Sequence, residues 1–467
     1  LRDAGFVLRV RNEGGAFVQT LKSANGADVA TRMELKGEVD GFAPDIAAIP
    51  DGRIRRQIKK ALDGRQLMPV FSVEMRRTTM LLVPRRGCEI EAAFDVGVVR
   101  TVGVGATASA PISEFELELL KGSPNDLVAC AKALTENVPL TLSLQSKAAR
   151  GYALTADSAE VPVSAQRIVL PKDATADVAF GHVVAHCLAH LLGNWSAVVV
   201  ARDPEGIHQM RVALRRLRSA LSLFGGAFRS ALHRVEEDVR WLAAVMGEAR
   251  DLDVFQEEVL RPVAEALGDD DWMRDLQTVV RSRRRIAWSH VFEALEAERF
   301  RRLVLELAAV TYSRPWLDAA KGDAGDALLP ASTFAAGRLE RRYSRAFKLG
   351  RRIDDLDAEE RHELRIRLKK LRYACDFFQS LFGKREVKRF LKRLGALQDV
   401  LGEMNDAAVA RALVREILAE HRDAEGVGSI GYAAGVVVGW HAGHAPERSR
   451  QLARRWRRFA KLRRPWR

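Results

Sequence analysis

Hydrophobic and polar residues alternate along three stretches in the first third of the chain, and this alternation predicts β-strands. The stretches are residues 6–11, 17–22 and 113–119. A period of two places every other side chain on the same face of a strand. The turn sequence Asn-Glu-Gly-Gly separates the first two stretches, and helices are expected near 53–63 and 124–136.

The pattern changes after residue 155. Residues 156–175 contain two prolines among small polar residues and are expected to form a linker. From residue 176 to 467 apolar residues recur at intervals of three, four and seven, the spacing of amphipathic helices. We therefore expect an α+β multidomain protein, with an antiparallel β domain over residues 1–155 and an all-α domain over 176–467.

The helical region contains an internal repeat. The segment HQMRVALRRLR at 208–218 matches HELRIRLKKLR at 362–372, and GEARD at 247–251 matches GEMND at 402–406. Two motifs in the same order at nearly the same offset indicate a duplication. We expect two related helical bundles packed as a pseudo-twofold pair, spanning about residues 176–320 and 330–467.

Basic side chains follow one face of each repeated helix, separate from its leucine stripe. Cations recur at i, i+4 and i+7, and no acidic residue lies between Arg211 and Arg218. Like charges at this spacing cost about 0.2–0.5 kcal/mol per pair. One interpretation is a solvated basic face. The repetition and the arginine content favour the other interpretation, a surface that binds an anionic polymer. The residues predicted to bind this polymer are His208, Arg211, Arg215, Arg218, His362, Arg365, Lys369 and Arg372.

The formal net charge of +14 favours a polyanionic partner, without distinguishing nucleic acid, anionic membrane and phosphate polymer. No uninterrupted apolar run reaches the roughly 18 residues of a membrane span, so no membrane partner is expected. The basic helices lack interleaved aromatic residues for base stacking, which disfavours nucleic acid. The four cysteines form no C-x-x-C pair, a usage typical of a reducing, cytoplasmic location. The oligomeric state is not predicted.

The repeated His-x-x-Arg-x-x-x-[Arg/Lys]-x-x-Arg helix, its Gly-x-x-Arg-Asp and Gly-x-x-Asn-Asp partners, and the C-terminal Arg-Pro-Trp resemble the CHAD domain family. This resemblance covers residues 176–467 and implies a helical domain that binds polyphosphate. Asp251 and Asp406 are interpreted as partners of nearby arginines rather than metal ligands. The tail 448–467, with ten Lys/Arg and no acid, either extends the phosphate surface or is frayed and solvated.

Charged residues also line up along the predicted strands. Glu114, Glu116 and Glu118 form an i, i+2, i+4 row, and basic residues occur at matching parity on other strands. A solvent-facing edge is one explanation of such a row. The other is a barrel interior in which basic side chains and a hard divalent cation neutralise the carboxylates.

The order Leu-Arg-Val-Arg, Gln-Thr-Leu-Lys, Arg-x-Glu, Glu-x-Glu-x-Glu and Ser-Lys-Ala-Ala-Arg-Gly-Tyr over residues 1–155 resembles the CYTH, or triphosphate tunnel metalloenzyme, family. The resemblance implies an antiparallel eight-stranded tunnel that hydrolyses inorganic triphosphate with Mg²⁺ or Mn²⁺. It assigns phosphate binding to Arg9, Arg11, Lys22, Arg32, Arg77, Lys147 and Arg150. It assigns metal binding to Glu34, Glu114, Glu116 and Glu118.

Two positions depart from the family pattern. The family opens with a Glu-x-Glu-x-Lys strand that is absent here, so we expect the chain to lack its natural N-terminus and to be nearly inactive as it stands. Lys36 stands where a second acid often follows Arg-x-Glu. The expected function is hydrolysis of triphosphate or short polyphosphate, with polyphosphate binding by the helical domain. Alternatives are an inactive polyphosphate-binding scaffold and a nucleotide cyclase or thiamine-triphosphatase.

Overall fold

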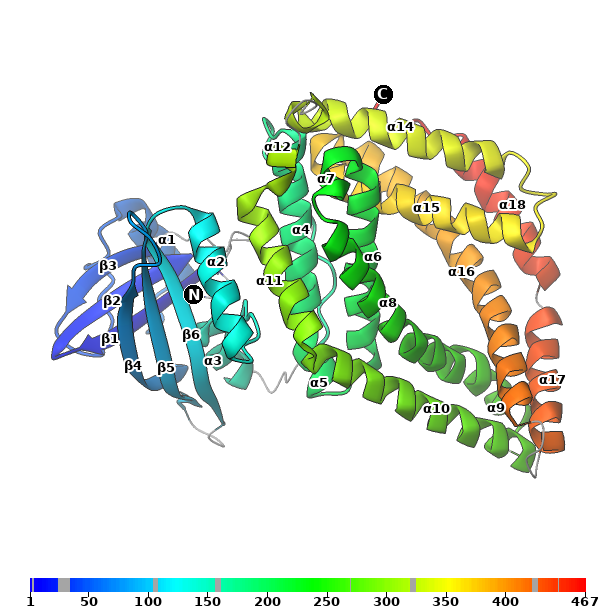
Figure 1. Ribbon diagram of the computed structural model, residues 1–467, viewed down its shortest axis with the longest axis horizontal. Coiled ribbons are helices and arrows are strands. Elements are labelled where there is room, and N and C mark those ends of the chain that lie inside the picture. Colours follow the sequence, from blue (N-terminus) through cyan, green and yellow to red (C-terminus); the bar gives the residue numbers. More distant parts are fainter. Residues whose placement is uncertain are drawn as a thin grey trace. The chain divides into compact units, whose positions relative to one another are not determined.

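The computed structural model describes residues 1, 4–23, 34–103, 108–155, 161–268, 270–319, 325–421, 427–443 and 445–467. The chain divides into two compact units. The first comprises Leu1–Ala133 and Ser143–Val161, and the second comprises Leu134–Leu142 and Pro162–Arg467. All described strands lie in the first unit, and the second is helical (Figure 1). The expected α+β organisation is confirmed.

The first sheet contains β1 (Phe6–Glu13), β2 (Ala16–Ser23) and β3 (Glu34–Val39), paired antiparallel in that order. The β1–β2 turn needs positive φ angles at Gly14 and Gly15, which glycine adopts without steric cost. Helix α1 (Gly52–Leu62) packs on the sheet through Ile54 and Ile58, which surround the buried Leu21. Sequence periodicity places this helix within one residue of its observed bounds.

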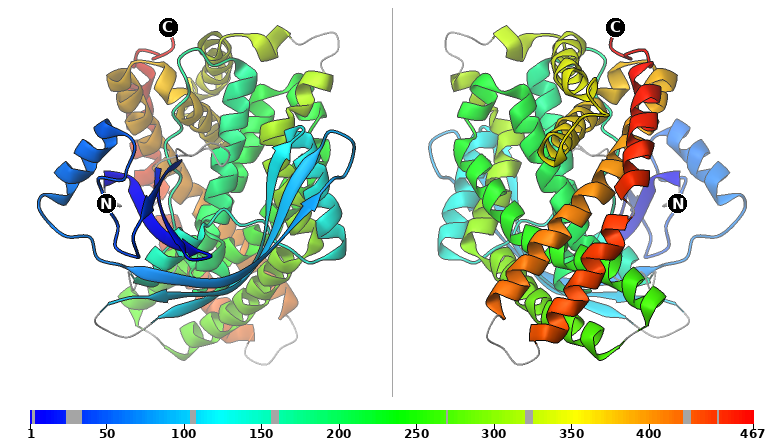
Figure 2. Two further views of the ribbon diagram at one scale, coloured as in Figure 1. Left: turned by 90° about the vertical axis from the view of Figure 1, so that its left-hand side faces the viewer. Right: turned by 90° about the vertical axis from the view of Figure 1, so that its right-hand side faces the viewer.

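The second sheet contains β4 (Phe71–Leu82), β5 (Glu89–Thr101) and β6 (Ser109–Lys121), again antiparallel in sequence order. Figure 2 shows it as long and curved. Helix α2 (Pro124–Asn137) follows, and α3 (Lys147–Thr155) packs against all three strands. A Cβ atom on Gly151 of α3 would lie 2.4 Å from the Phe71 ring, so glycine permits this close approach. The described strands thus form two three-stranded sheets, and the closed eight-stranded tunnel implied by the resemblance is not formed by these residues.

The helical unit repeats one order of long helices. The first half contains α4 (Ala176–Leu192), α6 (Pro204–Phe224), α8 (His233–Val254), α10 (Asp271–Glu296) and α11 (Glu298–Ser313). The second contains α14 (Ala331–Gly350), α15 (Ala358–Phe378), α16 (Lys384–Glu420), α17 (Val427–Gly443) and α18 (Ala445–Ala460). The shorter elements are α5 (Trp195–Val199), α7 (Gly226–Ser230), the π-helix η2 (Phe255–Leu260), α9 (Arg261–Leu267), α12 (Pro315–Ala319), α13 (Gly325–Leu328) and the 3₁₀-helix η3 (Gln379–Leu381).

Reciprocal backbone hydrogen bonds join the starts of the two halves. Thr175 and Pro330, the residues before α4 and α14, form an isolated antiparallel bridge. The amide of Ala176 donates to the carbonyl of Leu329 at 2.9 Å, and the amide of Ala331 donates to the carbonyl of Ala174 at 2.8 Å. Each half therefore makes the same contact to the other, as a pseudo-twofold relation requires.

The stretch Ala176–Val199 is long and apolar enough to cross a membrane by length and composition alone. In this structure 56% of its most apolar window is buried. Phe180, Val183 and Cys187 of α4 lie in the helical core, where Phe180 packs edge-on against Trp316. α4 is therefore buried in the way expected of a helix in the core of the helical unit.

Candidate functional site

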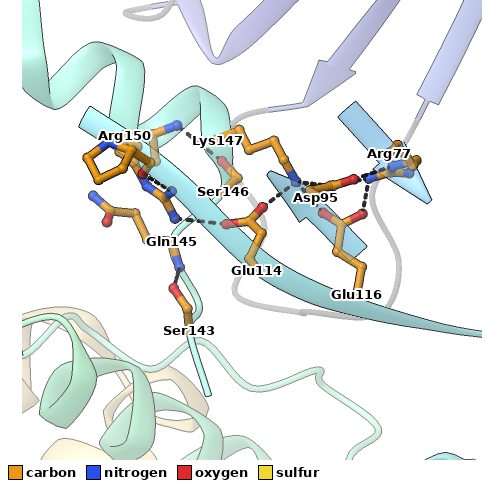
Figure 3. Close-up of polar contacts among 11 residues, drawn as sticks. Arg77, Asp95, Glu114, Glu116, Ser143, Gln145, Ser146, Lys147 and Arg150 are labelled. Atoms are coloured by element: carbon orange, nitrogen blue, oxygen red, sulfur yellow. Dashed lines mark hydrogen bonds and ion pairs between the residues drawn. The ribbon is translucent and has the colours of Figure 1, made fainter. Parts of the chain in front are cut away.

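Strand register brings charged residues of the second sheet together. Arg77 on β4 pairs with Asp95 on β5, and Asp95 pairs with Glu114 on β6. Directly opposed residues of antiparallel strands project from the same face, and Glu116 follows two residues later on that face. Carboxylate oxygens of Asp95, Glu114 and Glu116 lie within 4.8 Å of one another. We call these three residues the acidic cluster (Figure 3).

Three basic side chains are interleaved with the acidic cluster (Figure 3). Arg77 donates from Nε to Asp95 Oδ1 at 2.7 Å and from Nη2 to Glu116 Oε2 at 2.5 Å. Lys147 Nζ contacts Asp95 Oδ2 and Glu116 Oε1, both at 2.8 Å, and also pairs with Glu114. Arg150 Nη2 reaches Glu114 Oε2 at 2.9 Å. Three cations thus balance three carboxylates on one sheet face.

These contacts hold carboxylates in the charged form. The hydrogen bond from Arg77 lowers the pKa of Asp95, against the opposing effect of burial, and Lys147 adds to the lowering. Burial acts to raise the pKa of Glu116, but hydrogen bonding and charge from Lys147, with help from Arg77, outweigh it. Burial likewise opposes the raised pKa of Lys147, which the three carboxylates produce together. The site is therefore a dense set of fixed charges of both signs.

Helix α3 supplies two of the three cations. Lys147 and Arg150 lie three residues apart in its first turn, so both side chains reach the same sheet face. Arg150 also donates to the carbonyl of Pro111 at 3.3 Å. Because Gly151 lets α3 approach Phe71, the helix lies close enough to the sheet for these contacts.

Sequence reasoning missed Asp95. It is a single acidic residue in the apolar segment AAFDVGVV of β5, and its side chain is fully buried. A lone carboxylate in an apolar run has to be paired when it is buried, and this is the signal that could have identified Asp95. Its partners cannot be found from the sequence, because only the strand register brings them next to it. Glu118, predicted as a metal ligand, is exposed, pairs in register with Glu91 and lies outside the acidic cluster.

The remaining predicted residues of the first unit that the structure describes lie on the other sheet. Arg9 and Arg11 are on β1 and Lys22 is on β2. Arg9 pairs with Thr20, so the register places Lys22 on the face of the two arginines, as parity predicts. Glu34 begins β3 opposite Lys22 in the register. Arg32 lies outside the described residues.

In the helical unit, the two repeated helices bring their cations together. Helices α6 and α15 pack against each other, and Arg215 Nε donates to the Tyr373 hydroxyl at 3.3 Å. The pKa of Lys369 is lowered to about 7, mainly by burial and also by the charges of Arg365 and Arg215. Burial also lowers the pKa of Arg365, and Arg215 adds to that effect. Cations of both copies therefore share one surface.

The second repeated motif lies beside these cations. Arg211 Nη2 is 3.7 Å from Asp251 Oδ1, and a Cβ atom on Gly247 would lie 2.8 Å from Arg211 Nη1, so this glycine makes room for the guanidinium. Burial raises the pKa of Asp251, and the charge of Asp406 adds to it, so the two aspartates are also neighbours. Asp251 is thus placed as a partner of Arg211, and the charge of Asp406 acts on Arg365. The composite basic surface is formed by Arg211, Arg215, Arg250, Arg365 and Lys369.

Other predicted residues of the repeats have local partners. Burial lowers the pKa of His208 to about 4, with the charge of Arg250 next in effect, which favours a neutral imidazole. His362 Nδ1 is 2.8 Å from Asn405 Oδ1, and Arg372 donates to Gln398 at 2.9 Å. Arg250 follows Gly247 on α8 and was not among the predicted residues.

The basic tail packs onto the helical core. Glu340 of α14 accepts hydrogen bonds from Trp466 at 3.0 Å and from Arg467 at 2.7 Å, and it pairs with Arg464. Trp466 is buried. The terminal residues are therefore fixed against α14, and of the two interpretations of the tail, fraying does not describe them.

An open antiparallel sheet with interleaved carboxylates and cations, together with a duplicated helical bundle with a basic surface, defines a two-domain protein suited to anionic oxygen ligands. Residues 1–152 match the CYTH domain family and residues 182–415 match the CHAD domain family. The chain belongs to the CHAD domain family and carries a CYTH domain before its CHAD domain.

Known proteins are similar to both parts. The chain is 29% identical over 240 residues to an uncharacterized protein of Mycobacterium tuberculosis, covering 50% of this chain and 44% of that protein. It is 37% identical over 148 residues to an inorganic triphosphatase of Haemophilus influenzae, covering 32% of this chain and 40% of the relative. The chain thus spans less than half the length of these curated relatives. The crystal structure of a CHAD domain from the plant Ricinus communis aligns with 65% of this chain and 98% of that domain, at 29% identity and a TM-score of 0.55.

Proposed function

We propose that the CYTH domain of this protein acts in the hydrolysis of inorganic triphosphate or short polyphosphate with a divalent metal, and that the CHAD domain binds polyphosphate. The observation that carries the proposal is the acidic cluster interleaved with Arg77, Lys147 and Arg150. The similarity to a triphosphatase of Haemophilus influenzae supports the choice of substrate.

The residues fit a hard divalent cation. Asp95, Glu114 and Glu116 offer carboxylate oxygens within 4.8 Å of one another, and Mg²⁺ and Mn²⁺ prefer oxygen ligands of this kind. These three residues would hold the metal. When bound, it supplies charge neutralisation at phosphoryl oxygens and orientation of a water molecule.

The cations of the site are suited to bind the substrate. In the proposed reaction Arg77, Lys147 and Arg150 exchange part of their carboxylate contacts for oxygens of the triphosphate. Phosphoryl transfer depends mainly on positioning and on neutralising charge spread over the transferred group. Arg77 presents a planar fork of donors that matches two oxygens at once, whereas Lys147 acts as a point charge.

The test measures phosphate release from triphosphate with Mg²⁺, with Mn²⁺ and with EDTA, together with Mn²⁺ affinity by calorimetry. Asp95→Asn is expected to weaken both. Glu118→Gln is the matched control, because it removes a carboxylate from the same strand face outside the acidic cluster. Equal rates in EDTA and in metal would overturn the proposed mechanism.

A second candidate is a polyphosphate-binding scaffold without catalysis. The observation that favours it is that each carboxylate of the acidic cluster already forms an ion pair with a basic side chain. Such internal neutralisation competes with a metal. In this case Mn²⁺ does not bind to the first unit and triphosphate is not cleaved, while long polyphosphate still binds.

A further inference from the structure

A third helix carries cations at the spacing of the two repeated helices. Arg338, Arg342 and Arg345 lie at i, i+4 and i+7 on α14, the intervals of Arg211, Arg215 and Arg218 on α6. We call these three arginines the α14 row. The equivalent positions on α4, aligned through the Thr175–Pro330 bridge, are the buried residues Val183, Cys187 and His190. The α14 row is therefore a feature of the second half alone.

The α14 row lies where α14 meets α6 and α15. Arg338 donates to the carbonyl of Phe224 at 3.2 Å, and Arg342 approaches that of Ser219 at 3.5 Å. Both carbonyls belong to α6. From α15, Arg367 donates to the carbonyl of Arg345 at 2.7 Å. Arginines of α14 and α15 thus lie where these two helices meet, and those of α14 reach carbonyls of α6; we call this region the α14 seam.

Positive charge in this seam is concentrated. Burial lowers the pKa of Lys370 on α15, and four neighbouring arginines lower it further: Arg342, Arg218, Arg345 and Arg367. The pKa of Arg342 is lowered to about 10, mainly by burial and also by the charges of Arg345 and Arg338. Lys370 and Arg342 are therefore each surrounded by other positively charged side chains.

Few of these charges are neutralised by the protein. Arg338 pairs with Asp326 at 2.7 Å and Arg367 pairs with Glu363 at 2.5 Å. Within the part of the chain that the structure describes, no carboxylate forms an ion pair with the other four: Arg218, Arg342, Arg345 and Lys370. Like charges held close together without a counterion repel one another, and a bound polyanion removes that cost.

Arg218 connects this seam to the composite basic surface. It lies on α6 three residues after Arg215, whose charge acts on Arg365 and Lys369, whereas the charge of Arg218 acts on Lys370. On α15, Lys369 and Lys370 are separated by about 100° of helical rotation. Arg215 and Arg218, on neighbouring turns of α6, therefore connect the composite basic surface to the cations around the α14 row.

We propose that Arg218, Arg342, Arg345 and Lys370 form a second phosphate-binding site that holds the next segment of a polyphosphate chain bound at the composite basic surface. This inference rests on the proposed polyphosphate binding of the CHAD domain and extends it to a defined track. The four cations project from three helices without an exposed aromatic side chain among them, which suits a bare phosphate chain rather than stacked bases.

The test compares two double variants with the same change of charge. Arg342→Gln with Arg345→Gln removes two cations of the proposed site. Arg281→Gln with Arg285→Gln removes two exposed arginines, four residues apart on α10, that hydrogen-bond to Thr278 and Ser282. Affinities for tripolyphosphate and for long-chain polyphosphate are measured at several salt concentrations, after thermal melts have confirmed folding.

We expect the α14 variant to bind long-chain polyphosphate about tenfold more weakly, with a salt slope smaller by about 1–2, and to bind tripolyphosphate within about twofold of wild type. The α10 variant should match wild type with both ligands. Lys370→Gln, on another helix, should weaken long-chain binding in the same direction. Long-chain binding by the α14 variant equal to that of the α10 variant would overturn the second site. Wild-type protein that binds no polyphosphate would overturn the proposed function itself, and preference for single-stranded DNA over polyphosphate would overturn the choice of ligand.

Discussion

Arg77 and Asp95 face each other across β4 and β5, and two parallel hydrogen bonds of 2.7 and 2.6 Å join the guanidinium to the carboxylate. The Asp95 side chain is fully buried, whereas that of Arg77 retains 32% of its exposure. A buried group that loses its partner keeps its desolvation cost. The stability of the second sheet therefore depends on Asp95 being charged and paired with Arg77.

Asp95→Asn is expected to lower the free energy of unfolding by about 1–3 kcal/mol, because Arg77 and Lys147 lose a charged acceptor. Urea denaturation at pH 7 measures the change. Since the pKa of Asp95 is lowered in the folded state, its contribution is present above the unfolded value near pH 4 and is lost as the pH falls. Wild type and variant should therefore converge in acid. A constant difference down to pH 2 would contradict this account.

Glu116→Gln is expected to reduce the rate of triphosphate hydrolysis by at least about 10²-fold, the loss typical of a preorganised electrostatic group. Glu116 contacts both Arg77 and Lys147, so the amide also disturbs their orientation. The measurement is phosphate release at saturating metal, with Glu118→Gln as the control. A loss as large for Glu118→Gln would assign the effect to the general charge of the strand face.

Polyphosphate binding should take up a proton near pH 8. The pKa of Lys369 is about 7 because of burial and the charges of Arg365, Arg215 and Arg211, against the opposite effect of Asp406. The free side chain is then mostly neutral at pH 8, and a nearby polyanion raises its pKa. Calorimetry in two buffers with different ionisation enthalpies measures the uptake. Lys369→Arg should abolish it, because arginine stays charged, and unchanged uptake would locate the proton elsewhere.

The lowered pKa of Lys369 also determines how the stability of the protein changes with pH. The unfolded chain binds more protons than the folded protein between pH 7 and about 10.4, so the contribution of Lys369 to stability rises with pH over this range. Denaturant titrations of wild type and Lys369→Met across this range should show the difference. A variant whose stability rises with pH as much as that of wild type, or more, would contradict the assignment.

The two copies of the basic motif should contribute similarly to binding. Arg211→Ala with Arg215→Ala, and Arg365→Ala with Lys369→Ala, should each weaken long polyphosphate and flatten the salt dependence by similar amounts. The reason is that cations of both copies act on one another within one surface. If one double variant binds like wild type, the copies are not one site.

Periodicity predicted much of this molecule because its physical basis is local. Alternation along β6 placed Glu114 and Glu116 on one face, and repetition in the helical region predicted the paired halves. Asp95 was missed because its partners come from β4, β6 and α3, and only register brings them together. The α14 row was missed for a related reason, since it has no counterpart in the first half against which to recognise it.

The reciprocal hydrogen bonds at Thr175 and Pro330 carry a consequence for ancestry. Each half supplies one amide donor and one carbonyl acceptor at matching positions, and the other half satisfies them. Two identical half-length chains would satisfy each other in the same way. The CHAD domain thus has the geometry of a homodimer whose subunits were joined by gene fusion, after which the copies were free to diverge, as the α14 row has done.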